Sequence, residues 1–187
     1  MLAVAAAVAV AAYFAAKDEK PNMVAVGEDT VSIAETFTPP DQTKPYQKLV
    51  KISNTGTIPC YVRARIEFSD SDSQSRASFS GETAAPNDST VFYPADPAAE
   101  NSYTKHLPAD WEYNVTDGYY YYKNAVKPGE ETAALLAWVK MNYDDNEQAA
   151  AHDIYVYSES VQTVDPKTGA AYTDYSDAWT KFTAQAP

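Results

Sequence analysis

The chain has two histidines, His106 and His152, and a zinc peptidase would need a pair of such ligands. In the helical motif His-Glu-x-x-His, both imidazoles lie on one face and the glutamate is the general base. Here Leu-Pro-Ala-Asp follows His106 and Asp-Ile-Tyr follows His152, so neither histidine begins this motif. We therefore expect both to be surface or strand-end residues, and we expect no catalytic residue and no enzymatic activity.

Two groups of acidic residues could supply calcium ligands, because calcium prefers carboxylate and carbonyl oxygens. The first group, Asp70 and Asp72, lies in Ser-Asp-Ser-Asp-Ser and begins like an EF-hand loop. The sixth position of that loop is Ser75 instead of glycine, and the twelfth is Gly81 instead of a bidentate glutamate. The second group comprises Asp144, Asp145 and Glu147. We expect solvated loops at both places, no metal site and no cofactor, with weak extracellular calcium binding as the alternative.

Cys60 is the only cysteine, which excludes an intrachain disulfide and a metal site made of several thiolates. It alternates with Val62 and Ile66 along a predicted strand, so we expect a buried and unreactive thiol. A nucleophilic cysteine would need an activating base, and none lies nearby in the sequence.

Four consecutive tyrosines, Tyr119 to Tyr122, form a further candidate site. In a strand, successive side chains point to opposite faces, so this run places two rings on each face. Packing within a sheet explains such rings, because aromatic side chains favour strands. In the alternative, Tyr120 and Tyr122 form an exposed aromatic face that binds a carbohydrate or a partner protein.

The composition is that of an acidic domain with an ordinary share of hydrophobic residues. The chain has 187 residues, of which 26 are acidic and 14 basic, so its formal net charge is −12. Such a charge repels nucleic acids and anionic membrane surfaces, and we expect neither as a partner. The length predicts a single domain.

From Lys17 onward, hydrophobic residues recur with a period of two, which predicts half-buried β-strands. The predicted strands cover residues 31–37, 46–52, 60–68, 111–115, 119–123, 135–141 and 154–164. A four-residue turn that begins at Asn54 should join the second and third strands as a hairpin. Asp117-Gly118 is a strong hairpin signal between the fourth and fifth strands.

The segment from Ser69 to Asp110 is rich in Ser, Asp, Pro and Ala and has little periodicity. We expect a long insertion or loop there, with one strand of its own around Val91-Phe92-Tyr93. Near the C-terminus, Asp174 to Phe182 predicts a short helix that packs Trp179 and its other apolar residues inward. The absence of βαβ alternation and of a fixed repeat favours an all-β fold, an antiparallel β-sandwich of Greek-key or jelly-roll type.

Leu2 to Ala12 is an unbroken apolar run that is too short to span a bilayer as a helix, which needs about 20 residues. It fits the apolar core of a secretory signal peptide, and Ala9-Val10-Ala11 gives a small-x-small cleavage pattern. A buried core helix is the alternative. We predict a secreted protein that contacts the membrane only transiently, through its leader. The expected parts are a signal-peptide remnant at 1–11, an N-terminal segment at 12–26 and a single domain at 27–187.

Short motifs spread over most of the chain in a characteristic order. They are Val24-Ala25-Val26-Gly27 ahead of Val31-Ser32-Ile33, Val50 to Gly56 ahead of Pro59 to Arg63, Asp117 to Tyr122 ahead of Lys127 to Glu130, and Ser160 to Gln162 ahead of Ala178-Trp179. Their order and spacing resemble the TasA/camelysin family of secreted Gram-positive proteins, whose leader is removed by a dedicated signal peptidase. The match is piecewise and is weakest from Ser69 to Asp110.

This resemblance implies a jelly-roll subunit of an extracellular fibre or biofilm matrix. In such fibres, the N-terminal segment of one subunit adds a strand to an unpaired sheet edge of the next. A head-to-tail contact that does not close produces a filament. The partners are then further copies of this chain, together with an accessory or anchoring matrix protein. The expected polymer-interface residues are Ala12, Tyr13, Phe14, Val24 and Val26.

Two other functions stand as alternatives. The first is a monomeric cell-surface binding module that presents Tyr120 and Tyr122 to a glycan or a host protein. The second is a secreted metallopeptidase, because some camelysin relatives carry that label, although His106 and His152 lack the expected motif. A fibre subunit should polymerise through its N-terminal segment, a binding module should be a stable monomer, and a peptidase should hold zinc.

Overall fold

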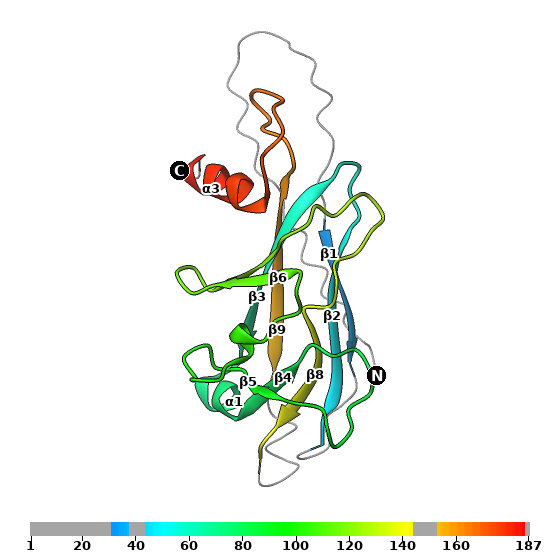
Figure 1. Cartoon of the computed structure of the whole chain (residues 1–187), viewed down its shortest axis with the longest axis vertical. Helices are drawn as coiled ribbons and strands as arrows, with labels where there is room; N and C mark the ends of the chain where they lie inside the picture. Colours follow the sequence, from blue (N-terminus) through cyan, green and yellow to red (C-terminus); the bar gives the residue numbers. More distant parts are fainter. Residues whose placement is uncertain (1–30, 38–43, 144–152, 186–187) are drawn as a thin grey trace.

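The computed structural model describes residues 31–37, 44–143 and 153–185, and its strands form two antiparallel sheets packed face to face (Figure 1). The expected all-β sandwich is therefore confirmed. One sheet has the order β1 (Val31–Phe37), β2 (Tyr46–Asn54), β8 (Leu136–Met141), β4 (Ala77–Ser80) and β5 (Tyr93–Pro94). The other sheet has the order β6 (Trp111–Asn114), β7 (Tyr119–Tyr122), β3 (Cys60–Phe68) and β9 (Ile154–Gln162).

The helices that the structure describes are short. They are α1 (Ser71–Arg76), the 3₁₀ helix η1 (Tyr103–Lys105) and α3 (Tyr175–Gln185). Over the described ranges, none has the length and apolar character needed to cross a bilayer. The C-terminal helix is confirmed as α3, which lies at the opposite end of the molecule from α1 (Figure 1). Ala178 and Trp179 pack against the four-stranded sheet, whereas Phe182, expected to point inward, is 44% exposed.

β2 shows how the period of two builds the core. Its buried side chains are Tyr46, Lys48, Val50, Ile52 and Asn54, with half-buried residues between them. From the other sheet, Cys60, Val62 and Ala64 of β3 face the same interior, which confirms the prediction that the thiol is buried. Burying one large aliphatic or aromatic side chain stabilises a fold by about 1.5–3 kcal/mol, so this interior is the main source of stability.

The hairpin signal at Asp117-Gly118 is confirmed, because β6 and β7 pair along their whole length. Gly118 has a φ of +76°, in the left-handed region that glycine adopts without a Cβ clash. Its N–H donates to the Asn114 carbonyl over 2.9 Å and closes the turn. The two tyrosine-rich faces of β7 are thereby fixed relative to β6.

The hairpin expected between β2 and β3 is wrong, because the two strands lie in different sheets. The chain crosses between the sheets after Asn54, whose side chain is buried. The amide nitrogen of Asn54 donates to the Ile58 and Val126 carbonyls, both at 2.8 Å. Its oxygen accepts a hydrogen bond from the Gly56 N–H at 2.9 Å. These bonds fix the segment in which the chain passes from one sheet to the other. The local turn residues had instead suggested a hairpin within one sheet.

The segment 69–110 belongs to the sandwich, which corrects the expected insertion. It contains α1, β4, β5 and η1, and β4 pairs with β8 inside the five-stranded sheet. Phe79 and Tyr103 are at most 1% exposed, and both belong to the main core. Of the strand expected around Val91-Phe92-Tyr93, only Tyr93 lies in a strand, the two-residue β5. Strands of four and two residues are too short to produce a clear period in the sequence.

Candidate functional site

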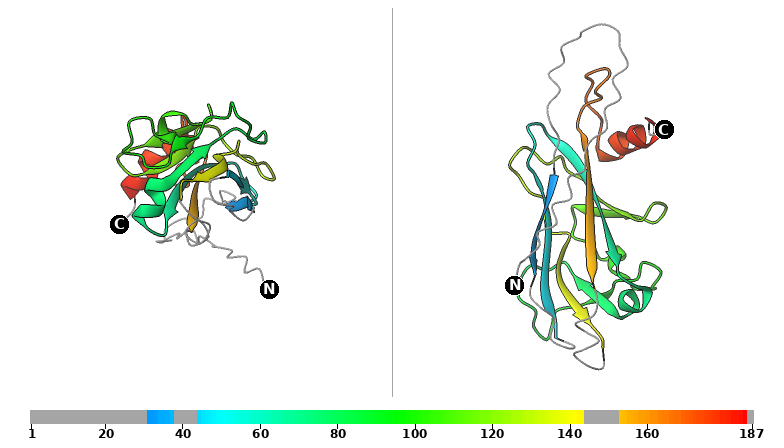
Figure 2. Two further views of the ribbon diagram at one scale, coloured as in Figure 1. Left: turned by 90° about the horizontal axis from the view of Figure 1, so that it is seen from below. Right: turned by 180° about the vertical axis from the view of Figure 1, so that it is seen from behind.

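β1 and β9 are the edge strands that lie next to each other along one flank of the sandwich (Figure 2). Among the described strands, β1 pairs only with β2 and β9 only with β3. Side chains from both strands pack on the core here and yet stay half-buried. They are Val31, Ile33, Ile154 and Val156. We call this flank the β1–β9 seam, and such sheet edges are templates for a further strand.

Several residues expected at functional sites lie outside the residues that the structure describes. This applies to the expected polymer interface, Ala12, Tyr13, Phe14, Val24 and Val26. It applies equally to the second calcium candidate, Asp144, Asp145 and Glu147, and to His152. Their roles stay predictions.

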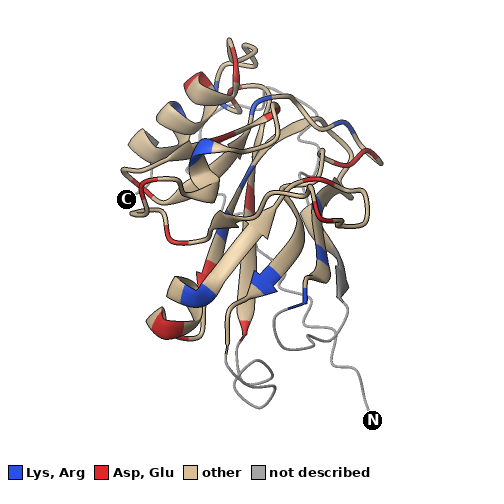
Figure 3. Ribbon diagram, turned by 60° about the horizontal axis from the view of Figure 1, so that its bottom comes forward, with Lys and Arg blue, Asp and Glu red and all other residues tan. Residues whose placement is uncertain are grey.

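Asp70 and Asp72 have structural roles in α1. The Asp70 carboxylate caps the helix, accepting hydrogen bonds from the Ser73 N–H and hydroxyl, both at 2.8 Å, and these bonds lower its pKa. Asp72 pairs with Arg76 at 2.9 Å, one helical turn later. Within residues 31–37, 44–143 and 153–185, no group of three or more His, Cys, Asp or Glu side chains could hold a metal ion. Acidic residues are spread over loops, helices and strands along the ribbon (Figure 3).

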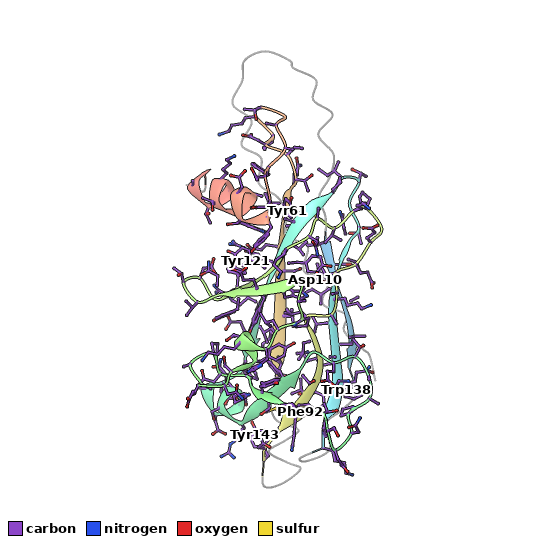
Figure 4. The ribbon with its side chains drawn as sticks, viewed as in Figure 1. Tyr61, Phe92, Asp110, Tyr121, Trp138 and Tyr143 are labelled. Atoms are coloured by element: carbon purple, nitrogen blue, oxygen red, sulfur yellow. The ribbon has the colours of Figure 1, made fainter. Side chains whose placement is uncertain are left out.

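Tyr120 and Tyr122 do not form an exposed ligand face, so that prediction is wrong. They are 3% and 9% exposed, and both belong to the main core. Tyr120 pairs with Ala64 of β3, an inward-facing residue, so the register between β7 and β3 turns these two rings inward. Tyr119 and Tyr121 consequently take the outer face, and Tyr121 lies close to α3 (Figure 4).

A buried arginine organises this outer face. Arg63 of β3 has Tyr121 of β7 and Glu159 of β9 as its cross-strand neighbours. Its guanidinium donates two hydrogen bonds to one Glu159 oxygen, at 2.8 and 2.6 Å, and one to the Tyr121 hydroxyl at 3.0 Å. The ring centroids of Tyr119 and Trp179 lie 3.9 and 4.3 Å from its central carbon. We call these five residues the Arg63 cluster, which fastens α3 to the sheet.

Burial and hydrogen bonding set the protonation states in the Arg63 cluster. Burial by itself lowers the pKa of Arg63, but hydrogen bonds to Glu159 and Tyr121 and their charges raise it above its ordinary value. Burial, followed by a hydrogen bond to Asp117, raises the pKa of Tyr121. Burial and the charge of Glu159 raise the pKa of Tyr119. Both tyrosines are therefore neutral phenols at pH 7, and they donate to Asp117 at 2.5 Å and to Glu159 at 3.1 Å.

The stability of the domain should fall as the pH rises above about 10. Tyrosines of the unfolded chain have a pKa of 10.0, whereas burial raises the pKa of Tyr103 and Tyr120, and burial with a hydrogen bond to Glu112 raises that of Tyr175 to about 12. Above pH 10 the tyrosines of the unfolded chain lose their protons, whereas the buried tyrosines of the native state keep theirs. The stability that these tyrosines contribute is therefore complete below pH 10 and is lost as the pH rises from 10 through their native pKa values. Urea unfolding at about pH 8 and about pH 11 checks this. An equal free energy of unfolding at both pH values would contradict it.

His106 is a surface residue with local partners. Its ring stacks on Tyr93 with the centroids 3.7 Å apart, and its Nε2 lies 2.6 Å from the side-chain oxygen of Asn101. The prediction that His106 is an ordinary surface residue is thus compatible with its surroundings. The surroundings of His106 therefore give no support to the metallopeptidase alternative.

The Arg63 cluster is the feature that sequence reasoning missed. Its signal was the pair Arg63 and Arg65 on the outward side of a strand whose inward side is apolar. A tryptophan in the C-terminal helix, Trp179, was a second signal that the outer face is covered. Neither signal states which helix lies on which strand, because that contact joins segments more than a hundred residues apart.

No protein-family model matches the chain, and no curated protein matches it either. The resemblance to the TasA/camelysin family stays a prediction from the motifs. The β1–β9 seam and the outer face beneath α3 are therefore the basis for assigning a function.

Proposed function

We propose that this protein is a secreted structural subunit of an extracellular fibre or matrix, in which one copy adds an N-terminal strand to the β1–β9 seam of the next. The seam supports this proposal because it combines two sheet edges with core side chains that are only half-buried. Val31 and Ile33 come from β1, and Ile154 and Val156 come from β9. An added strand would cover these side chains and gain backbone hydrogen bonds in register.

We place the added strand against β9. This strand has nine residues and β1 has seven, so β9 offers the longer ladder. β9 contains no lysine or proline, the residues with which proteins often block an edge. Within the donor segment 12–26, Val24 and Val26 are two residues apart, which puts both on one face of an extended strand.

The remaining parts of the proposal follow from this assembly. The sandwich is of jelly-roll type, in keeping with consecutive strands that change sheet, such as β2 to β3 and β7 to β8. The partners are other copies of the chain and an anchoring matrix protein, and the subunit has no enzymatic activity and needs no cofactor. The net charge of −12 makes copies repel each other, so salt should favour assembly.

Deleting the N-terminal segment tests the proposal directly. A chain that begins at Ala12 should form filaments in negative-stain microscopy and scatter light increasingly with concentration and salt. A chain that begins at Gly27 should remain monomeric, because it lacks the donor segment. Monomers from both chains, with equal thermal stability, would overturn the fibre function.

A matched pair of lysine substitutions tests the position of the added strand. Val156→Lys puts a charge into the seam and should abolish filaments, whereas Val115→Lys adds the same charge in the β6–β7 turn, where Val115 is 83% exposed, and should leave filaments intact. Circular dichroism would check that both variants fold. If both variants polymerise equally well, the strand does not add at β9.

The monomeric binding module is not retained in its original form, since Tyr120 and Tyr122 lie in the core. The metallopeptidase alternative has no supporting observation among the described residues. Strand addition is therefore the function that the described surfaces support best.

A further inference from the structure

A groove of about 330 Å³ lies between α3 and the β6–β7 hairpin, away from the edges that form the seam. Three aromatic residues of its lining are Tyr121 from β7, and Tyr175 and Trp179 from α3. Two carboxylates, Glu112 and Asp117, line it from the hairpin side. The volume is near the lower end of the range of about 300–1,000 Å³ that is typical of small-molecule sites.

Hydrogen bonds across the groove hold its walls in place. The Tyr175 hydroxyl donates to the Glu112 carboxylate at 2.7 Å and so ties α3 to β6. The Tyr121 hydroxyl donates to the Asp117 carboxylate at 2.5 Å. Behind these rings, the Arg63 cluster fixes Trp179 from the sheet side. The aromatic rings are therefore preorganised, which lowers the entropic cost of binding a ligand.

The chemistry of the lining selects against anions. Among the described residues, the lining contains two carboxylates and no lysine or arginine, and Arg63 lies behind it, 4.0 Å from Asp117. The excess of negative charge disfavours a phosphate, a sulfate or a uronic acid. Further polar residues of the lining are Asn114, with its amide, and the hydroxyl-bearing Tyr113, Ser176, Thr180 and Thr183. Amides and hydroxyls both donate and accept, and carboxylates accept, which matches a ligand that is rich in hydroxyl groups.

Trp179 forms the inner wall of the groove. It is 3% exposed, and its buried indole N–H, which has no hydrogen-bond partner within the described residues, is not accessible to a ligand. The more exposed Tyr175 is therefore the ring that a ligand would contact first. Aromatic rings beside hydroxyl-binding groups also suit the apolar C–H faces of a sugar ring.

We propose that this groove binds a neutral carbohydrate, about one or two sugar units of a longer chain. The site goes beyond the fibre function and does not depend on it. A fibre subunit with this groove would display one carbohydrate site per copy, so a polymer would bind a glycan multivalently.

Calorimetric titration of the full chain with four tetrasaccharides tests the proposal. The neutral probes are cellotetraose and N-acetylchitotetraose, the cationic probe is the deacetylated chitotetraose, and the anionic probe is tetragalacturonate. We expect at least one neutral probe to bind and tetragalacturonate to bind at least tenfold more weakly. The absence of binding by both neutral probes, or binding by the cationic probe alone, would overturn the neutral-carbohydrate assignment.

Two matched pairs of variants locate the site. Tyr175→Ala should weaken binding at least tenfold, whereas Tyr157→Ala, which removes an exposed tyrosine of β9, should leave it unchanged. Thr180→Val removes a hydroxyl of the groove and should weaken binding, whereas Thr168→Val removes an exposed hydroxyl outside the groove and should not. Thermal unfolding would check that each variant folds. Equal affinities within each pair would overturn the assignment of the groove, whether or not filaments form.

Discussion

Replacing Phe79 by alanine should lower the free energy of unfolding by about 3–5 kcal/mol. Phe79 lies on β4, is 1% exposed and stacks on Phe68 with the ring centroids 5.8 Å apart. Tyr103 meets the same ring edge-on, with a centroid distance of 5.6 Å. The substitution removes a whole ring from between the sheets and leaves a cavity that the neighbouring strands cannot fill.

Phe182→Ala is the matched control for this substitution. Phe182 is 44% exposed at the end of α3 and touches Trp179 edge-on, so its loss should cost about 1 kcal/mol or less. Urea unfolding of both variants and of the parent chain measures the difference. If Phe79→Ala costs no more free energy of unfolding than Phe182→Ala, Phe79 and its segment 69–110 do not contribute to the main core.

Glu159→Gln should destabilise the domain by about 2 kcal/mol, because it removes the nearer counter-charge of the buried Arg63 and leaves only Asp117, at 4.0 Å. The Arg63 side chain is 9% exposed and that of Glu159 is 35% exposed, so water offsets part of the loss. The surface pair Lys51–Glu131, with side chains 35% and 45% exposed, gives a control. There, Glu131→Gln should cost at most about 1 kcal/mol.

A double-mutant cycle separates the charge from the packing. In an Arg63→Met background, Glu159→Gln should cost much less, since no buried cation is left to compensate. In the parent background, the loss of stability caused by Glu159→Gln should be accompanied by weaker packing of α3 on the sheet. A change in the fluorescence of Trp179, which lies against the guanidinium, would report it. An equal cost of Glu159→Gln in both backgrounds would show that the Arg63 cluster is not electrostatically coupled.

The two proposed surfaces both involve the four-stranded sheet but use different strands and different groups. Strand addition uses backbone atoms at the edge of β9 and apolar side chains such as Val156 that face the core. The carbohydrate groove uses Tyr175 and Trp179 of α3 and the turn of the β6–β7 hairpin. Because the groups differ, Val156→Lys should abolish filaments and spare carbohydrate binding, whereas Tyr175→Ala should do the reverse.

Local pattern in the sequence determined most of the strands and the C-terminal helix. The period of two places β1, β2, β3, β8 and β9, because alternation between core and solvent is a property of each strand by itself. Asp117-Gly118 predicted the β6–β7 hairpin for a similar reason, since glycine at φ +76° satisfies the turn locally. Among the residues considered as candidate sites, the burial of Cys60 followed from alternation alone.

Tertiary structure alone decided which strands are neighbours and which faces they bury. Asn54 and its bonds to Ile58 and Val126 send β2 and β3 into different sheets, although the turn residues between them suit a hairpin. The four tyrosines of β7 are chemically identical, so only pairing with Ala64 turns Tyr120 into the core. The β1–β9 seam and the groove beneath α3 likewise arise from contacts between distant segments. Such contacts depend on how whole sheets pack against each other, so they cannot be predicted from the spacing of residues within one strand.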